Sequence, residues 1–276
     1  MQSSNACDSE TGALRSLLET EYAFGQRAQT SVRAAFLEYL AEDSLVLEPA
    51  PVSGRAFYTA AKEEAGSLEW YPAGADLADS GDVGFTTGPW MYSRTGVQIH
   101  GHFLTIWRRD AACRWKVEFD GGVSHAADAS AEPKLAADAA STTQRIGPAA
   151  KLVAEDAVSR AIGDFQDTAR EDGFPAGLRT YARTVDFRFY TDGEIPMGVA
   201  AANRYLIAHT VAGAWKEDGR GRSADSTLAY SVGELLDAQQ RGSHAYAQIW
   251  QYDPRVASWG LRVLLMTPLG PSKEKT

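Results

Sequence analysis

The sequence contains the same hairpin pattern twice. Residues 100–120 read HGHFLTIWRRDAACRWKVEFD, and residues 244–263 read HAYAQIWQYDPRVASWGLRV. Each copy has Ile-Trp, an Asp three residues after that Trp, and then a second Trp. The matched residues are Trp107, Asp110 and Trp115 in the first copy and Trp250, Asp253 and Trp259 in the second.

The matches continue outside the hairpin, in the same order along the chain. The offset between partners stays between 142 and 146 residues; examples are Leu45 with Phe187, Gly54 with Gly198, Trp70 with Trp215 and Gly88 with Gly233. A period this long indicates two copies of a whole domain, because solenoid units are about 20 to 50 residues long. Two domains also suit a chain of 276 residues.

The composition divides the chain accordingly. Residues 124–149 are mostly Ala, Ser, Asp, Thr and Pro, which is typical of a linker. We predict a leader over residues 1–11, a first domain over 12–124, a linker over 125–149, a second domain over 150–269 and a tail over 270–276.

Both halves have the same predicted order of elements: helix, helix, short strand, helix, and then antiparallel strands. The predicted helices start at Ala13 and cover 30–42, 54–66, 151–169, 176–184 and 197–213. The predicted strands cover 44–49, 68–80, 83–93, 102–110, 114–122, 185–193, 226–239, 244–253 and 258–267. The stripe on the first helix is mostly apolar but includes one carboxylate: Leu14, Leu17, Leu18, Glu21 and Tyr22.

The repeated letters of the hairpin predict architecture. Asp110 and Asp253 occupy the first turn position between two strands, where an Asp side chain accepts hydrogen bonds from turn amides. The spacing to the second Trp is one residue longer in the second copy. The two Trp residues of each copy flank the turn and are expected to cover the same end of the sheet.

This order of elements, with the ending HFLTIWRRDAACRWKVEFD, resembles the nuclear transport factor two-like superfamily. The resemblance is closest to SnoaL-like domains and related bacterial domains of unknown function. It implies an α+β fold of two consecutive cone-shaped domains, each a curved antiparallel sheet wrapped around about three helices and enclosing an apolar pocket. The family includes ketosteroid isomerases, scytalone dehydratase, polyketide cyclases, epoxide hydrolases and non-catalytic binding or dimerisation modules.

Such domains often dimerise through the face of the sheet. The resemblance therefore implies that the two halves pair with each other, or across a homodimer.

The candidate catalytic residues are His102, Glu118 and Asp120. Strict alternation puts Glu118 and Asp120 on one face of the last strand of the first half. If His102 shares that face inside the cone, a His and two carboxylates are placed for general acid–base chemistry. The alternative is a solvated outer face. The three matched positions in the second half are Ala245, Arg262 and Leu264, so a single site would lie in the first half.

Large aromatic residues are candidate walls of the ligand pockets. The candidates are Tyr22, Tyr39, Trp70, Tyr181, Trp215 and Tyr230. The alternative for each is an ordinary place in the hydrophobic core.

The charge and the motifs limit the partners. A net charge of −9 and a pI near 5.1 disfavour nucleic acid and membrane surfaces. The sequence has no phosphate-binding or dinucleotide-binding motif and no nucleophile motif, so we expect no cofactor. The pair His100 and His102 is too small a set to indicate a metal site.

Two cysteines, Cys7 and Cys113, leave their oxidation state open. The N-terminus has no charged region followed by an apolar core, and it resembles the polar start of a mature exported protein with Met added. The sequence leaves an exported and a cytoplasmic location open.

We therefore expect a protein that binds a small apolar molecule in a cone pocket, acts as a pseudo-dimeric scaffold, or both. The alternative is a cofactor-free lyase, isomerase or hydrolase that uses His and carboxylate groups of the first domain.

Overall fold

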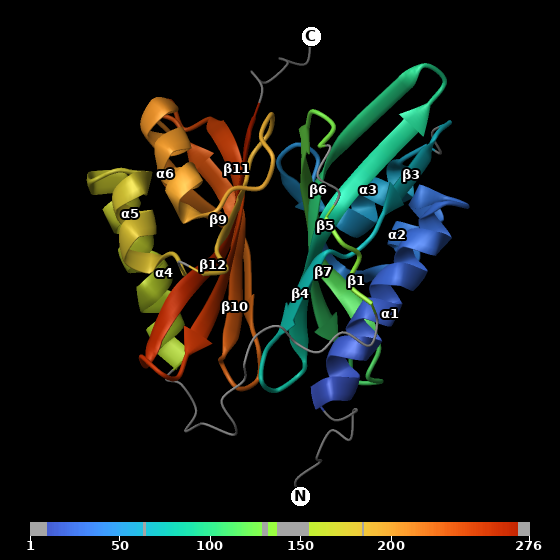
Figure 1. Cartoon of the computed structure of the whole chain (residues 1–276), viewed down its shortest axis with the longest axis horizontal. Helices are drawn as coiled ribbons and strands as arrows, with labels where there is room; N and C mark the ends of the chain where they lie inside the picture. The colour runs from blue at the N-terminus through green and yellow to red at the C-terminus, as the bar shows by residue number, and fades with distance from the viewer. Residues whose placement is uncertain (1–9, 63–64, 129–131, 137–154, 184, 270–276) are drawn as a thin grey trace, which may run out of the picture.

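The chain forms four layers, with helices outside and two sheets facing each other in the middle (Figure 1). Helices α1, α2 and α3 cover the outer face of the first sheet, and helices α4, α5 and α6 cover the outer face of the second. The computed structural model describes residues 10–62, 65–128, 132–136, 155–183 and 185–269.

The first half contains three helices and a seven-stranded sheet with the order β2-β1-β7-β6-β5-β3, and β4 also pairs with β5. All pairs are antiparallel except β1 with β7. The helices are α1 (Glu10–Ala28), α2 (Val32–Tyr39) and α3 (Gly54–Ala60). The strands are β1 (Leu40–Leu47), β2 (Pro51–Ser53), β3 (Ser67–Trp70), β4 (Gly74–Leu77), β5 (Val83–Arg94), β6 (Val97–Arg109) and β7 (Trp115–His125).

The second half repeats this plan with a five-stranded sheet of order β8-β12-β11-β10-β9, in which β8 is parallel to β12. Its helices are α4 (Glu155–Glu171), α5 (Phe174–Tyr181) and α6 (Val199–Ala208). Its strands are β8 (Arg188–Tyr190), β9 (Ala214–Arg222), β10 (Leu228–Leu236), β11 (Gly242–Asp253) and β12 (Ser258–Pro268). The predicted α+β class with two consecutive domains is confirmed; the exact domain boundaries stay predictions.

Two strands, β2 and β9, are missing from the sequence prediction. Strand β9 has the sequence AWKEDGRGR, which carries five charged residues and two glycines. It pairs only with β10 at the edge of the sheet, and most of its side chains are exposed or half-buried. An edge strand tolerates such residues because one side faces solvent, so it lacks the apolar alternation that identifies a central strand.

The repeated hairpin has the predicted architecture. Asp110 Oδ1 accepts hydrogen bonds from the backbone N–H of Ala112 (2.8 Å) and Arg114 (2.9 Å), and Asp253 Oδ1 accepts one from Arg255 (2.9 Å). Hydrogen bonds, led by those from Arg114, hold the pKa of Asp110 below its usual value. The paired tryptophans of each copy are buried in the core beneath the helices.

The inner faces of the two sheets meet in a buried apolar layer, which we call the intersheet layer. Its fully buried members include Val83, Phe85, Leu104, Ile106 and Phe119 from the first half and Leu228, Val232, Ala247, Ile249 and Val263 from the second. Polar contacts also cross between the halves: Gln251 Nε2 donates to Asp76 Oδ2 (3.1 Å), and Ser124 N donates to Asp192 Oδ1 (2.8 Å).

Part of the predicted linker lies against the first half. Leu135 N donates to Pro72 O (2.9 Å), and the Tyr22 hydroxyl donates to Leu135 O (2.6 Å). The Tyr71 hydroxyl donates to Glu132 O (3.0 Å). Linker composition alone did not predict this docking, since it depends on hydroxyl groups more than 60 residues away. Residues 129–131 and 137–149 of the predicted linker lie outside the described residues.

Cys113 is disulfide-bonded, and the described part of the chain contains no free cysteine. Cys7 lies outside the described residues. None of the described helices has both the length and the apolar character required to cross a membrane.

Candidate functional site

A cavity of about 370 Å³ lies in the first half, between the sheet and helices α2 and α3. Six aromatic side chains line it: Phe36, Tyr58, Trp70, Trp90, Tyr92 and Phe103. Asp120 and Glu48 are its two acidic residues. A mainly apolar cavity of this size with few polar groups is typical of small-molecule sites.

Glycines on the sheet make room for the Trp90 indole. A Cβ at Gly101 would lie 2.5 Å from the Trp90 ring and 1.9 Å from the Val123 carbonyl oxygen. A Cβ at Gly122 would lie 3.2 Å from Trp90 Nε1. Both distances to Trp90 are shorter than ordinary van der Waals contact, so the indole can lie against these strands only where side chains are missing.

Gly101→Ala is therefore expected to destabilise the protein by about 3 kcal/mol, because the added methyl group meets backbone as well as Trp90. Urea unfolding followed by circular dichroism measures this. Gly163→Ala, in the middle of α4 with open space around its Cβ, is the control and should stabilise by about 0.5–1 kcal/mol. Equal stabilities of Gly101→Ala and the wild type would contradict the close packing of the Trp90 indole against Gly101.

Asp120 is one of the two acidic residues that line the aromatic cavity. Its side chain is half-buried and lines the cavity, and Thr105 Oγ1 donates to its Oδ2 at 2.7 Å. Burial raises the pKa of Asp120 from 3.8 to about 8, against the hydrogen bond from Thr105, and the charges of Glu21 and Glu48 add to the increase. The carboxyl group is therefore largely protonated at pH 7 and can donate a hydrogen bond.

Tyr58 adds a hydroxyl group to the same cavity. Its ring stacks on Phe36 with centroids 4.1 Å apart. Burial, together with the charges of Asp120 and Glu48, raises the pKa of Tyr58, so its hydroxyl stays protonated and remains a donor.

A β-bulge separates Glu118 from Asp120, contrary to the predicted alternation. Ile106 pairs with Phe119 and Trp107 pairs with Val117, which leaves Glu118 as an extra residue on β7. Glu118 consequently faces the second half. It accepts hydrogen bonds from Arg108 Nε and from the Tyr230 hydroxyl, each at 2.5 Å. The hydrogen bond from Tyr230 ties the two sheets together outside the aromatic cavity.

His102 also lies away from Asp120. It pairs with Pro89 and Val123, whose strands put these side chains on the face opposite Phe103 and Thr105. Its Nδ1 lies 2.7 Å from His125 Nε2, and its Nε2 lies 3.3 Å from Glu132 Oε2. The predicted meeting of His102 with both carboxylates is wrong: the structure puts these three residues in three different surroundings.

Both rings of the histidine pair are fully engaged. His125 Nδ1 lies 2.7 Å from the Ala126 carbonyl and must donate to it, and His102 Nε2 must carry a proton to donate to Glu132. The remaining two ring nitrogens face each other, so all four have hydrogen-bond partners within the protein.

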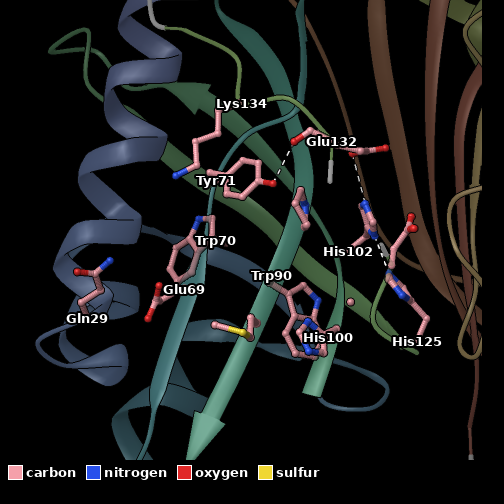
Figure 2. A pocket seen from close by; sticks show the side chains of 14 residues that line it. Gln29, Glu69, Trp70, Tyr71, Trp90, His100, His102, His125, Glu132 and Lys134 are labelled. Atoms are coloured by element: carbon pink, nitrogen blue, oxygen red, sulfur yellow. Dashed lines mark hydrogen bonds and ion pairs between the residues drawn. The ribbon is translucent and has the colours of Figure 1, made fainter. Parts of the chain in front are cut away.

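A second cavity, of about 350 Å³, lies beside this pair (Figure 2). Trp70 and Trp90 line both cavities and form their common wall. Polar groups such as His100, Glu69 and Lys134 surround the second cavity. Among the described residues, His, Cys, Asp and Glu form no group of three or more that is placed to hold a metal ion.

Of the six predicted wall residues, Trp70 lines the cavities described above. The hydroxyls of Tyr22 and Tyr230 bond to Leu135 and Glu118 respectively, and Tyr39 packs on Phe24. Tyr181 and Trp215 pack against the core of the second half. No observation tests the ligand-binding roles of these residues.

Sequence reasoning did not select Glu21, which is completely buried. Its Oε1 accepts from Trp70 Nε1 (2.6 Å), and its Oε2 accepts from Thr86 Oγ1 (2.5 Å) and Trp107 Nε1 (3.1 Å). Burial raises the pKa of Glu21, against the hydrogen bonds that lower it. A usable signal was present: Glu21 is the one carboxylate in the stripe of the first helix.

No protein-family model matches the sequence, and no curated protein matches it significantly. Solved structures do match. A nuclear transport factor two-like protein from Salmonella enterica is 8% identical, with a TM-score of 0.36, and the match covers 45% of this chain and 99% of that one. A putative ketosteroid isomerase from Parabacteroides distasonis is 16% identical, with a TM-score of 0.33, covering 38% and 85%.

A protein of the DUF4783 family from Bacteroides ovatus is 13% identical, with a TM-score of 0.30, and the match covers 38% of this chain and 92% of that one. These values describe similarity only, and the α+β plan of each half rests on its own helices and strands. The resemblance to the nuclear transport factor two-like superfamily stays a prediction.

Proposed function

We propose that the first half binds a small, uncharged cyclic molecule in its aromatic cavity and that the second half serves as its structural partner. One observation carries this proposal: the carboxyl group of Asp120, bonded to Thr105, lines a mainly apolar cavity with six aromatic side chains in its wall. Its raised pKa, about 8, favours the protonated form. A neutral carboxyl donates a hydrogen bond, so it selects a ligand with an acceptor such as a carbonyl oxygen.

The second half supports placing the ligand site in the first half alone. Leu264 stands 144 residues after Asp120 and is completely buried in the apolar core of that half. The layer that packs the second sheet on the first is a cluster of buried apolar residues, as a stable scaffold requires.

The test compares two probes of nearly equal shape, the bicyclic ketone α-tetralone and its parent hydrocarbon tetralin, by isothermal titration calorimetry at pH 6. The ketone is expected to bind about tenfold more tightly, as one added hydrogen bond implies. Asp120→Leu should remove that preference. Equal affinities for ketone and hydrocarbon in the wild type, or no binding of either, would contradict the proposal.

A second candidate function is proton transfer at the carbon next to a carbonyl. The pKa of Asp120 near 8 favours it, because a base is most effective when its pKa lies near the working pH. Exchange of the α-protons of α-tetralone in D₂O, followed by NMR, measures this activity. Exchange should rise with pH up to about 8 and vanish in Asp120→Asn, whereas ligand binding through the protonated carboxyl falls over the same range.

A further inference from the structure

Glu21 is a buried carboxylate that the fold itself does not require. It stands on α1, and all the hydrogen bonds to it come from side chains: the indoles of Trp70 and Trp107 and the hydroxyl of Thr86. Burying a carboxyl group is unfavourable unless its oxygens are well paired, and here both oxygens are.

The second half shows what the same position looks like without a carboxylate. Phe165 stands 144 residues after Glu21, within the offset of the repeat. Its ring centroid lies 6.0 Å from Trp215 and 5.7 Å from Trp250, the counterparts of Trp70 and Trp107. Phe165 is completely buried as well. In the first half Phe24 makes similar ring contacts with Trp70 (4.9 Å) and Trp107 (5.9 Å), so the ring is common to both halves, whereas neither indole of the second half donates to a carboxylate.

The two indoles of the second half are also anchored differently. Trp215 Nε1 donates to the Gln166 carbonyl (3.2 Å), and Trp250 Nε1 donates to Gln248 Oε1 (3.0 Å). In the first half, the carboxylate of Glu21 accepts hydrogen bonds from both indoles. The half that has the aromatic cavity and Asp120 is also the half in which Trp70 is bound to a buried carboxylate.

Trp70 is the residue through which Glu21 reaches the cavity. Its indole lines the aromatic cavity and the second cavity, and Figure 2 shows it on the wall of the latter. Phe24 contacts it edge-on with centroids 4.9 Å apart, and a Cβ at Gly25 would touch its ring at 3.5 Å. Helix α1 therefore holds the indole of Trp70 in two ways. Phe24 and Gly25 lie against the ring, and Glu21 accepts a hydrogen bond from Nε1, the only polar atom of the ring.

We propose that Glu21 is a positioning residue that fixes the Trp70 indole as the wall between the two cavities and so sets the shape of the ligand site. The expected effect of Glu21 on ligand affinity rests on the proposed function, whereas its expected effect on Trp70 does not. A ligand that fills the aromatic cavity should contact this wall directly, whereas Glu21 acts on the ligand only through Trp70.

The experiment uses the full chain and three variants. Glu21→Phe copies the residue of the second half, Glu21→Gln keeps one acceptor oxygen for Trp70, and Glu19→Gln is the matched control at an exposed position of the same helix. Two readouts are taken: the indole N–H resonance of Trp70, assigned with Trp70→Phe in ¹H–¹⁵N spectra, and the affinity for α-tetralone.

In Glu21→Phe, the Trp70 N–H should move upfield and exchange with water at least tenfold faster, and the affinity for α-tetralone should fall at least tenfold. Glu21→Gln should restore both readouts to near wild-type values. Glu19→Gln should change neither.

An unchanged Trp70 resonance in Glu21→Phe overturns the inference, as does an unchanged affinity when the resonance has moved. If the wild type binds no ketone, the proposed function fails, and the Trp70 resonance alone decides whether Glu21 positions that side chain. If Glu21→Phe does not fold, Glu21→Gln decides: loss of the Trp70 hydrogen bond in that variant would also count against the inference.

Discussion

Replacing Asp120 by asparagine is expected to flatten the dependence of stability on pH between pH 5 and pH 8. Burial raises the pKa of Asp120 from 3.8 to about 8. Between these two values the folded protein holds a proton that the unfolded chain has already released. The stability contributed by this group is therefore complete below pH 3.8, falls as the pH rises, and levels off above about pH 8.

The size of the effect follows from the same linkage. A group that is protonated only in the folded state changes the free energy of unfolding by at most about 1.4 kcal/mol per pH unit. Because Asp120 is only half-buried and lines a cavity, we expect a slope of about 1 kcal/mol per pH unit. Asp120→Asn keeps an oxygen for Thr105 but has no titrating proton, so it should become progressively more stable than the wild type as the pH rises.

Urea unfolding at pH 5, 6, 7 and 8 measures the difference between the two proteins, in which other titrating groups largely cancel. Asp110→Asn is the control: the pKa of Asp110 is lowered, so this group stays ionised in both states over this range and its removal should give a constant offset. Parallel curves for Asp120→Asn and the wild type would show that Asp120 is not held protonated by the fold.

The architecture could be predicted because its signals are local or repeated. The two tryptophans and the turn Asp of each hairpin recur at nearly constant offset, and the structure gives Asp110 and Asp253 the same turn-capping role. The helix and strand order of the two halves followed from apolar periodicity in the same way. The periodicity depends on neighbours within a few residues, and the recurrence depends on comparing two stretches of the same chain, so both are visible in one sequence.

The candidate site could not be assembled because it depends on one inserted residue and on distant contacts. Strict alternation places Glu118 beside Asp120, but the bulge at Glu118 sends its side chain to the other face of the sheet. The engagement of His102 depends on Glu132, 30 residues away in the predicted linker. Bulges and contacts from linkers leave no periodic trace in a sequence.

Glu21 illustrates a signal that was present but was not used. It lies on the apolar stripe of the first helix, where a carboxylate must be paired or exposed. The same position of the second copy is Phe165. Where a polar residue of one copy aligns with an apolar residue of the other, the two copies have diverged in role. Asp120 with Leu264 is a second example.

Ile106→Asp is expected to disrupt the packing of the two halves and to give the largest loss of stability considered for this chain. Ile106 is completely buried in the intersheet layer, between Phe85 and Phe119 on the neighbouring strands. A carboxyl group there has no described partner and must either stay charged in an apolar layer or take up a proton. Either outcome should reduce the free energy of unfolding by about 4 kcal/mol or more.

Differential scanning calorimetry distinguishes this from an ordinary packing defect. The wild type should unfold in one cooperative transition, because both sheets share one core layer. Ile106→Val removes a single methylene group and should lower stability by about 1 kcal/mol while keeping one transition. Ile106→Asp should instead separate the unfolding of the halves or abolish the transition. A loss of less than 1 kcal/mol in Ile106→Asp would mean that water reaches this layer in solution, and that each half holds its structure without the other.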